Sequence, residues 1–381
     1  MTDRQTDRQT DRQTDRQTDR QTDRQTDRQT DRQTDRRIKW IDCAKAIAIM
    51  AVAVDHCNRL LYTNPFIAQA SYFSVSLFIL LSGISTRFAS ERKRRTFIYQ
   101  FKKIRFLYVQ YAVATFILLV FYKHQFDLNT YISHMLNFSI QGPYYFLVFF
   151  FQLMIIAPFL LSWCEFCNSR KYRYIFHIIT CLLLGYASVL CIRYTYILPV
   201  HGGGKYLFGG TYIILFYLGI LFADRNMFEM TVKKRVVVSM IGMLFWCIWY
   251  KMGACGILPF DAWMQPYFGS GFNPPSIQII IFAIITLFVA YSVFSLLETI
   301  ENIYIKKTVD FLCFLGKNTI YIFMYHLLVR DVAVKYFSAL STNKWMMRIF
   351  VFSTMVVMPA LGIQAVRKLR DYYKNEMAGR R

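Results

Sequence analysis

The sequence predicts an all-α, polytopic membrane protein with about ten transmembrane helices and both termini in the cytoplasm. The first observation behind this fold class is composition: 55% of the residues are hydrophobic and 18% are aromatic, which is typical of membrane proteins. The second is a series of apolar segments, each long enough to cross a hydrocarbon core of about 30 Å. The third is that basic residues gather in short segments between the apolar ones.

Residues 1–36 form a low-complexity tail. Residues 2–33 are eight copies of Thr-Asp-Arg-Gln, in which the charges cancel and no side chain is apolar. Such a segment cannot bury a core, so we expect it to be disordered. The codons ACA GAC AGA CAG encode this unit and also repeat the tetranucleotide ACAG, which slips during replication and shifts the reading frame. We therefore expect a phase-variable gene, a device typical of genes that alter the cell surface.

The apolar segments predict a membrane domain over residues 37–370, followed by a basic cytoplasmic tail over residues 371–381. The ten expected helices lie near residues 40–61, 71–89, 104–122, 143–161, 174–192, 207–223, 235–250, 277–297, 311–330 and 349–366. An even number of spans places both termini on the same side of the membrane.

The loops between these helices alternate in charge. With the N-terminus inside, the cytoplasmic loops contain fifteen Lys and Arg residues and the outer loops about eight, so the positive-inside rule selects this orientation. The same clustering accounts for the formal net charge of +22 without a nucleic-acid partner.

The first expected helix contains ionisable residues at membrane depth, where they are costly and typical of functional sites. Lys45 lies in its inner half, and Asp55 and His56 lie near its outer end. Lys45 and His56 are eleven residues apart, which is about 16 Å along an α-helix. Asp42 and Lys45 are three residues apart and could simply neutralise each other, or Lys45 could bind an anion from the cytoplasm.

His326 lies near the outer end of the ninth expected helix, on the same side as His56. The two could therefore converge on one outer pocket, where neutral histidine is the usual general base near pH 7. Either histidine could also be interfacial, with a backbone carbonyl as its partner. Asp55 precedes His56, but adjacent residues on a helix point about 100° apart, so an orienting bond between them is not assured.

Six segments carry a resemblance to a known family. They are RIKWIDCAKAIAIMAVAVDH, LFILLSGISTRFA, FKKIRFLYVQY, GPYYFLVFFFQLMIIAPFL, FYLGILFADRN and LGKNTIYIFMYHLLV. In order and helix placement they resemble the integral-membrane acyltransferase family three, which includes O-acetyltransferases of bacterial surface polysaccharides. The first is similar to the family's signature of Arg or Lys, ten residues and His, with Lys45 where Arg is more common. The resemblance covers roughly residues 37–366.

For the acyl donor, the resemblance implies acetyl-CoA. We expect no metal, because no second Cys or His pair follows Cys164 and Cys167 at zinc-site spacing. The phosphates of CoA need cations, and charge-assisted contacts from Lys and Arg suit them. The candidates on the inner side are Lys45, Arg95, Lys102, Lys103 and Arg105. Each of the loop cations could also serve only to set the topology.

For the acceptor, the resemblance implies a glycan or lipid-linked sugar, such as lipopolysaccharide or capsule, outside the bacterial inner membrane. His56 would take the proton of a sugar hydroxyl. His326 or a tyrosine would stabilise the oxyanion, and Tyr144 or Tyr145 stands where the family often has Trp. Of the two, Tyr145 is the candidate, and Asp55 completes the predicted catalytic set.

Several alternatives stay open. A glycan transporter or flippase is the main one from another class, and it would show internal repeats with broken helices. Within the enzyme class, a succinyltransferase and a covalent acetyl-histidine intermediate are both compatible with these residues. The HGGGK segment at residues 201–205 lacks the serine elbow of an esterase, and Cys164 and Cys167 lack a second pair at zinc-site spacing.

Overall fold

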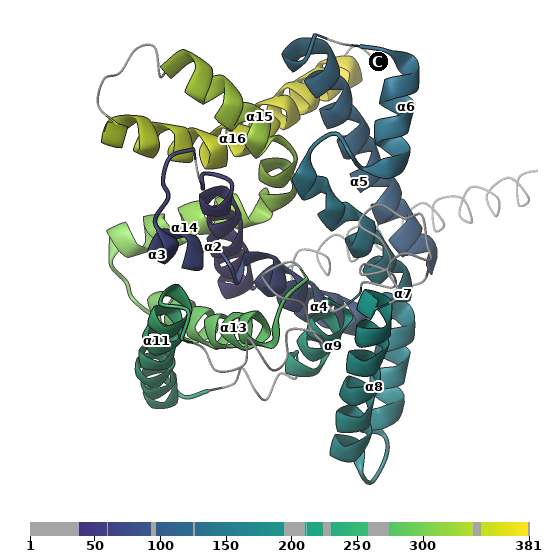
Figure 1. The fold of residues 1–381 in the computed structure, drawn as a ribbon, viewed down its shortest axis with the longest axis vertical. Helices are drawn as coiled ribbons and strands as arrows, with labels where there is room; N and C mark the ends of the chain where they lie inside the picture. The colour runs from purple at the N-terminus through teal and green to yellow at the C-terminus, as the bar shows by residue number, and fades with distance from the viewer. Residues whose placement is uncertain are drawn as a thin grey trace, which may run out of the picture. The chain divides into compact units, whose positions relative to one another are not determined.

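In the computed structural model, the described residues are 38–58, 60–92, 97–124, 126–193, 210, 212–223, 230–257, 274–337 and 344–379. Within these ranges the chain forms helices and turns, with one isolated bridge between Asn58 and Tyr62 (Figure 1). The all-α fold class is confirmed for this part of the chain. The repeat tail, the segment at residues 201–205 and Arg95 lie outside it.

The helices are named in chain order. The N-terminal half contains α2 (Lys39–Asp55), α3 (Pro65–Gln69), α4 (Ser74–Arg92), α5 (Phe97–Ile117), the π-helical turn η1 (Leu118–Tyr122), α6 (Leu128–Asn137), the 3-10 turn η2 (Gly142–Tyr144), α7 (Tyr145–Asn168) and α8 (Arg173–Arg193). The C-terminal half contains α9 (Tyr212–Phe222), α11 (Val232–Ala254), α13 (Ile277–Leu297), α14 (Ile303–Lys317), α15 (Thr319–Phe337) and α16 (Lys344–Gly379). The last helix therefore continues into the predicted C-terminal tail.

Seven helical segments of the described residues are long and apolar enough to cross a membrane. They are Pro65–Glu91, Phe97–Tyr122, Gly142–Asn168, Arg173–Cys191, Val232–Ala254, Ile277–Leu297 and Trp345–Tyr373. An eighth results if α14 and α15 count as one span, although they meet at an angle of 81°. These segments support a multi-pass membrane protein, whereas the number ten and the cytoplasmic position of both termini stay predictions.

Three expected helices differ from the observed ones. The segments expected near 40–61 and 207–223 form α2 and α9, which have 17 and 11 residues and are shorter than the roughly 20 residues of a full span. The helix expected near 311–330 breaks at Asn318. There the Asn318 side chain donates to the Phe314 carbonyl at 2.9 Å, while its own carbonyl accepts from the amides of Tyr321 and Ile322 at the start of α15.

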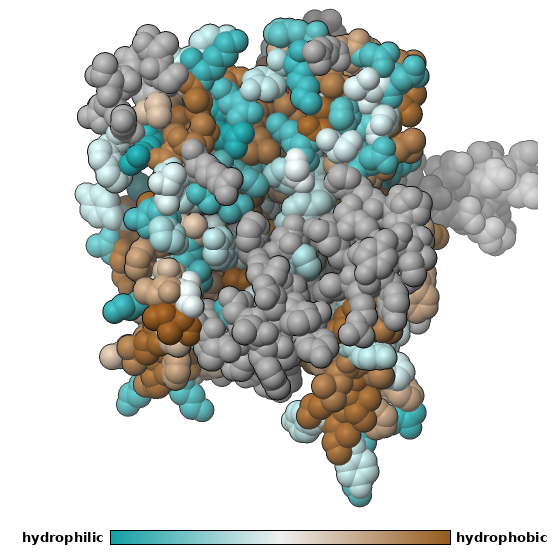
Figure 2. Space-filling model, viewed as in Figure 1, coloured by the Kyte–Doolittle hydropathy of each residue, from teal (hydrophilic) through white to brown (hydrophobic). Residues whose placement is uncertain are grey.

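Helices α8 and α11 expose apolar side chains. No residue of α11 is buried, and Figure 2 shows hydrophobic surface over α11 and α8. The exposed side chains of α8 include Ile175, Ile178, Ile179, Leu182 and Leu183, and those of α11 include Val237, Met240, Leu244 and Phe245. Water-soluble proteins rarely expose contiguous apolar surfaces of this extent, so we assign both faces to contact with lipid.

Helix α2 lies among six other helices of the described residues. It contacts α3, α4, α13, α14, α15 and α16, and Figure 1 shows it in the interior of the bundle. Its alanines at positions 44, 46, 48 and 53 have no exposed surface. Small side chains let neighbouring backbones approach closely in membrane proteins, which explains how one short helix can be packed on so many sides.

Helices α4 and α9 cross with their backbones in contact. A Cβ atom added to Gly83 would collide with the carbonyl oxygen of Phe216, and one added to Gly219 would collide with that of Leu80. Because backbone atoms cannot move aside as side chains do, only glycine fits at either position. The residues beside the crossing, Ser82 and Phe216, line the cavity described below.

Replacing Gly83 or Gly219 by alanine is therefore expected to destabilise the fold by about 1–3 kcal/mol, the usual cost of overpacking. Thermal unfolding of the purified protein in detergent measures this as a lowered Tm. Gly362→Ala is the matched control, because that glycine is exposed on helix α16 with no atom near the added carbon. An equal fall in Tm for all three variants would contradict the assigned crossing.

Candidate functional site

Two histidines from distant parts of the sequence lie side by side. His56 follows the last residue of α2, and its amide still donates to the Val52 carbonyl at 3.1 Å. His326 lies in the middle of α15. The centroids of the two imidazole rings are 5.1 Å apart, and the ring planes are inclined by 38°. The structure thus forms a pair of titratable groups at the end of α2, while their catalytic roles stay predictions.

The surroundings of His326 assign its tautomer. Its side chain is almost fully buried, with 1% exposed, and Nδ1 lies 2.8 Å from the Phe323 carbonyl and 3.1 Å from that of Ile322. Carbonyl oxygens only accept, so Nδ1 must carry the proton. Nε2 is buried and has no hydrogen-bond partner among the described residues. A buried acceptor left without a partner costs about 1–3 kcal/mol, which favours a functional reason for its position.

This tautomer changes the role expected for His326. In the neutral ring the single N–H is used on backbone carbonyls, so Nε2 can accept a proton but cannot donate one to an oxyanion. A proton-accepting role therefore fits the geometry better than the oxyanion-stabilising role that the sequence suggested.

Asp55 lies beside the pair without a tight bond to it. Its Oδ2 is 3.9 Å from His56 Nδ1, beyond hydrogen-bond range. Its Oδ1 is 3.5 Å from the Ser71 hydroxyl, which donates at 2.6 Å to the Ala68 carbonyl. Asp55 thus contributes charge near His56, but the carboxylate does not hold the imidazole in a fixed orientation.

Tyr144, at the start of α7, contacts the helix of His326. Tyr144 is buried, and its hydroxyl donates to the Met324 carbonyl at 2.6 Å. Its ring also meets the ring of Phe323 edge to face at 5.9 Å. The ring of Tyr145 packs against Phe149 of its own helix at 6.0 Å. Tyr144 therefore helps to position α15 beside the histidine pair, and the catalytic role of Tyr145 stays a prediction.

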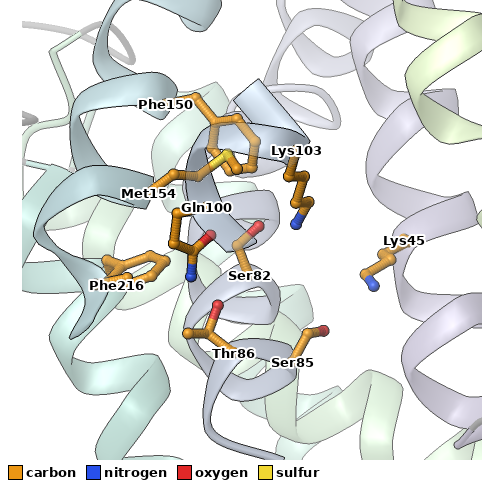
Figure 3. Close-up of a pocket in the computed structure, with 10 residues that line it drawn as sticks. Lys45, Ser82, Ser85, Thr86, Gln100, Lys103, Phe150, Met154 and Phe216 are labelled. Carbon is orange, nitrogen blue, oxygen red and sulfur yellow. The ribbon is translucent and has the colours of Figure 1, made fainter. Parts of the chain in front are cut away.

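A cavity lies nearer the start of α2. Its volume is about 460 Å³ including its opening, and its polar lining comes from Lys45, Ser82, Ser85, Thr86, Gln100 and Lys103. Phe150, Met154, Ala157 and Phe216 supply the apolar wall. In Figure 3 the amino groups of Lys45, from α2, and Lys103, from α5, approach the same space. Two ammonium groups with several hydroxyls favour an anionic ligand.

The other predicted cations are placed differently. Lys102 and Arg105 are exposed on α5, as Lys103 is, but unlike Lys103 they do not line the cavity. Arg95 lies outside the described residues. Sequence reasoning missed the hydroxyls of Ser82, Ser85 and Thr86 in the LFILLSGISTRFA segment. The sequence did contain a signal for them. Ser85 and Thr86 lie three and four residues after Ser82, which places all three hydroxyls on one helix face.

Arg330 is a further residue that sequence reasoning missed. It lies four residues after His326, on the same face of α15, and its Nη1 donates to the His56 carbonyl at 2.8 Å. Among the described residues, no group of three or more His, Cys, Asp and Glu side chains could hold a metal ion.

Comparison with known proteins identifies one family. The family model of an acyltransferase domain matches residues 38–363, a range that contains the histidine pair and every residue of the cavity. No curated protein and no solved structure matches the chain.

The contact between Tyr144 and Met324 gives a prediction for this tyrosine. Tyr144→Phe removes a buried hydrogen bond and is expected to lower the free energy of unfolding by about 1 kcal/mol. Tyr304→Phe, the same change at an exposed tyrosine of α14, is expected to leave it nearly unchanged. Denaturation of both variants under identical conditions measures the difference, and a larger effect for Tyr304→Phe would show that the assignment is wrong.

Proposed function

The chain belongs to acyltransferase family 3, and on that premise we propose that it moves an acetyl group from cytoplasmic acetyl-CoA to a hydroxyl of a cell-surface glycan. The observation that carries this proposal is the arrangement along α2. A cavity with two cations includes Lys45, and a histidine pair includes His56, eleven residues further on. A charged acyl donor needs cations such as those of the cavity, and a hydroxyl acceptor needs a base such as the histidine pair.

The donor end supports the first half of the proposal. Phosphates of CoA are anions, and the ammonium groups of Lys45 and Lys103 match their charge. The Ser85 hydroxyl, which has no hydrogen-bond partner among the described residues, can donate a hydrogen bond to them. The apolar wall of the same cavity suits an uncharged acyl arm. The distance of about 16 Å from Lys45 to His56 is of the same order as the length of that arm.

The acceptor end supports the second half. In the proposed reaction His56 removes the proton of the acceptor hydroxyl, and the lone pair on His326 Nε2 beside it shares that proton. The hydroxyl oxygen bonds to the acetyl carbon, the carbon–sulfur bond breaks, and CoA leaves as a thiolate that takes up a proton. The side chain of His56 is 24% exposed, so it is the member of the pair that an acceptor can reach.

The cellular setting is part of the same proposal. We place the enzyme in the bacterial inner membrane, with a lipopolysaccharide, capsule or related lipid-linked sugar as acceptor on the outer side. The Thr-Asp-Arg-Gln repeat would then act through its DNA, switching surface acetylation on and off.

The test of this function is analysis of the surface polysaccharide from cells with the gene in frame and out of frame. We expect a mass difference of one acetyl group per modified sugar, and His56→Ala and His326→Gln are each expected to lower transfer about a hundredfold or more, because general-base catalysis is lost. His134→Gln is the control, since that histidine bonds to Ser139 near the end of α6. A mass difference of one succinyl group would show that the enzyme transfers succinyl and not acetyl. No mass difference between the two polysaccharides would refute the proposal.

The cavity gives a separate prediction for donor binding. Lys45→Gln and Lys103→Gln are each expected to raise the KM for acetyl-CoA about tenfold, the effect of losing one charge-assisted hydrogen bond. Lys102→Gln is the matched control, because Lys102 is exposed beside Lys103 and does not line the cavity. Initial rates at varied acetyl-CoA concentrations measure this. A Lys102 variant as impaired as the other two would place the donor elsewhere.

A further inference from the structure

We propose that Arg330 is a positioning residue that holds the C-terminal turn of α2, and with it the imidazole of His56, against His326. The consequence for catalysis rests on the proposed function, whereas the structural role does not. Three observations carry the inference: the hydrogen bond from Arg330 to His56, the fixation of Arg330 by Asp331, and the packing of the turn that follows α2.

The hydrogen bond meets a need of the helix end. The last carbonyls of an α-helix lack partners within it. Here the carbonyls of Val54 and Asp55 accept from the amides of Cys57 and Asn58 at 3.0 Å. The His56 carbonyl accepts from Arg330 Nη1 at 2.8 Å. A guanidinium at this position also complements the negative end of the helix dipole.

Asp331 fixes the guanidinium in this position. Nε and Nη2 of Arg330 lie 2.7 and 2.6 Å from the same carboxylate oxygen of Asp331. The two side chains are only 22% and 18% exposed, so solvent screens the pair less than it would an exposed one. With two of its nitrogens engaged on Asp331, Arg330 presents Nη1 to His56 in one defined geometry.

The turn after α2 is packed by apolar residues, some of them on α15. Cys57 is 3% exposed and its sulfur meets that of Met355 at 3.5 Å, while the Tyr62 hydroxyl donates to the Val54 carbonyl at 2.8 Å. Cys57 and Leu61 belong to an apolar cluster that also contains Ile322 of α15. Arg330 adds to this non-directional packing a hydrogen bond from α15 to the backbone of His56.

The experiment compares Arg330→Gln and Arg330→Lys with a matched control. The chain offers a second Arg–Asp neighbour pair, Arg370 and Asp371, which is bonded at 3.2 Å but is 61% and 60% exposed. Arg370→Gln therefore removes the same kind of side chain from the same kind of pair, away from the histidines. Asp331→Asn serves as a second, milder test if an Arg330 variant fails to fold.

The first readout needs no enzymatic activity. Modification of Cys57 by a neutral maleimide, resolved from the other cysteines by peptide mass spectrometry, reports opening of the turn. We expect about a tenfold faster reaction in Arg330→Gln, because loss of a hydrogen bond to a charged donor lowers the cost of local opening. Asp331→Asn should be intermediate, Arg330→Lys should recover part of the protection, and Arg370→Gln should match the parent protein.

The second readout is kinetic. In the Arg330 variants kcat for acyl transfer is expected to fall about tenfold or more, with the KM for acetyl-CoA within about twofold, since a displaced base weakens the chemical step and not donor binding. A fall in kcat with unchanged Cys57 protection would overturn the positioning role and make Arg330 a substrate contact. Unchanged behaviour in both readouts would also overturn it. Faster Cys57 modification in a protein that transfers no acyl group would support positioning and refute the proposed function alone.

Discussion

The burial of helix α2 is the constraint on which the rest of the structure depends. Four of its alanines have no exposed surface, because six other helices of the described residues pack around it. The polar groups near its ends must then find partners within the protein. At one end Lys45 lines a cavity with Lys103, and at the other His56 meets His326. Because one rigid helix carries both groups, helix geometry alone sets their separation.

The residues that hold these groups lie outside the two sites. Contact between Gly83 and Gly219 fixes α4 against α9, and thereby the cavity wall formed by Ser82 and Phe216. On the other side, the bond from Tyr144 to Met324 fixes α15 two residues before His326. Each site therefore depends on a contact with the backbone of a neighbouring helix. Backbone contacts tolerate less change than contacts between flexible side chains, and this explains why the smallest substitution at a crossing is expected to be costly.

The sequence predicted the helical membrane fold and the spaced pair of Lys45 and His56, because both follow from local pattern and helix register. It could not choose among the cations of α5, since Lys102 and Lys103 differ only in the rotation of that helix, which packing against α7 decides. For the same reason, the sequence could not show which of the adjacent Tyr144 and Tyr145 contacts α15. The break between α14 and α15 was missed because hydropathy is an average over a window. The hydrogen bonds of Asn318 with Phe314 on one side and with Tyr321 and Ile322 on the other do not register in such an average. Beside the break, Gly316 lies against the carbonyl of Asp42 so closely that a Cβ would collide, a contact between distant parts of the sequence.

The length of α2 bears on the proposed reaction. Its 17 residues extend about 26 Å, less than a hydrocarbon core of about 30 Å. Two ammonium groups reach one cavity nearer its start, and both attract an anion that enters there. The histidine pair makes no such demand for an anion, because His326 is held as the neutral tautomer with a free lone pair. The two sites therefore suit different groups. The cavity at Lys45 suits an anion, and the histidine pair suits a neutral proton donor. Acyl transfer satisfies both requirements. The phosphates of the donor stay in the cavity, and its uncharged acyl arm reaches a sugar hydroxyl at the histidine pair. A transported glycan would instead have to pass through both environments with one set of chemical groups.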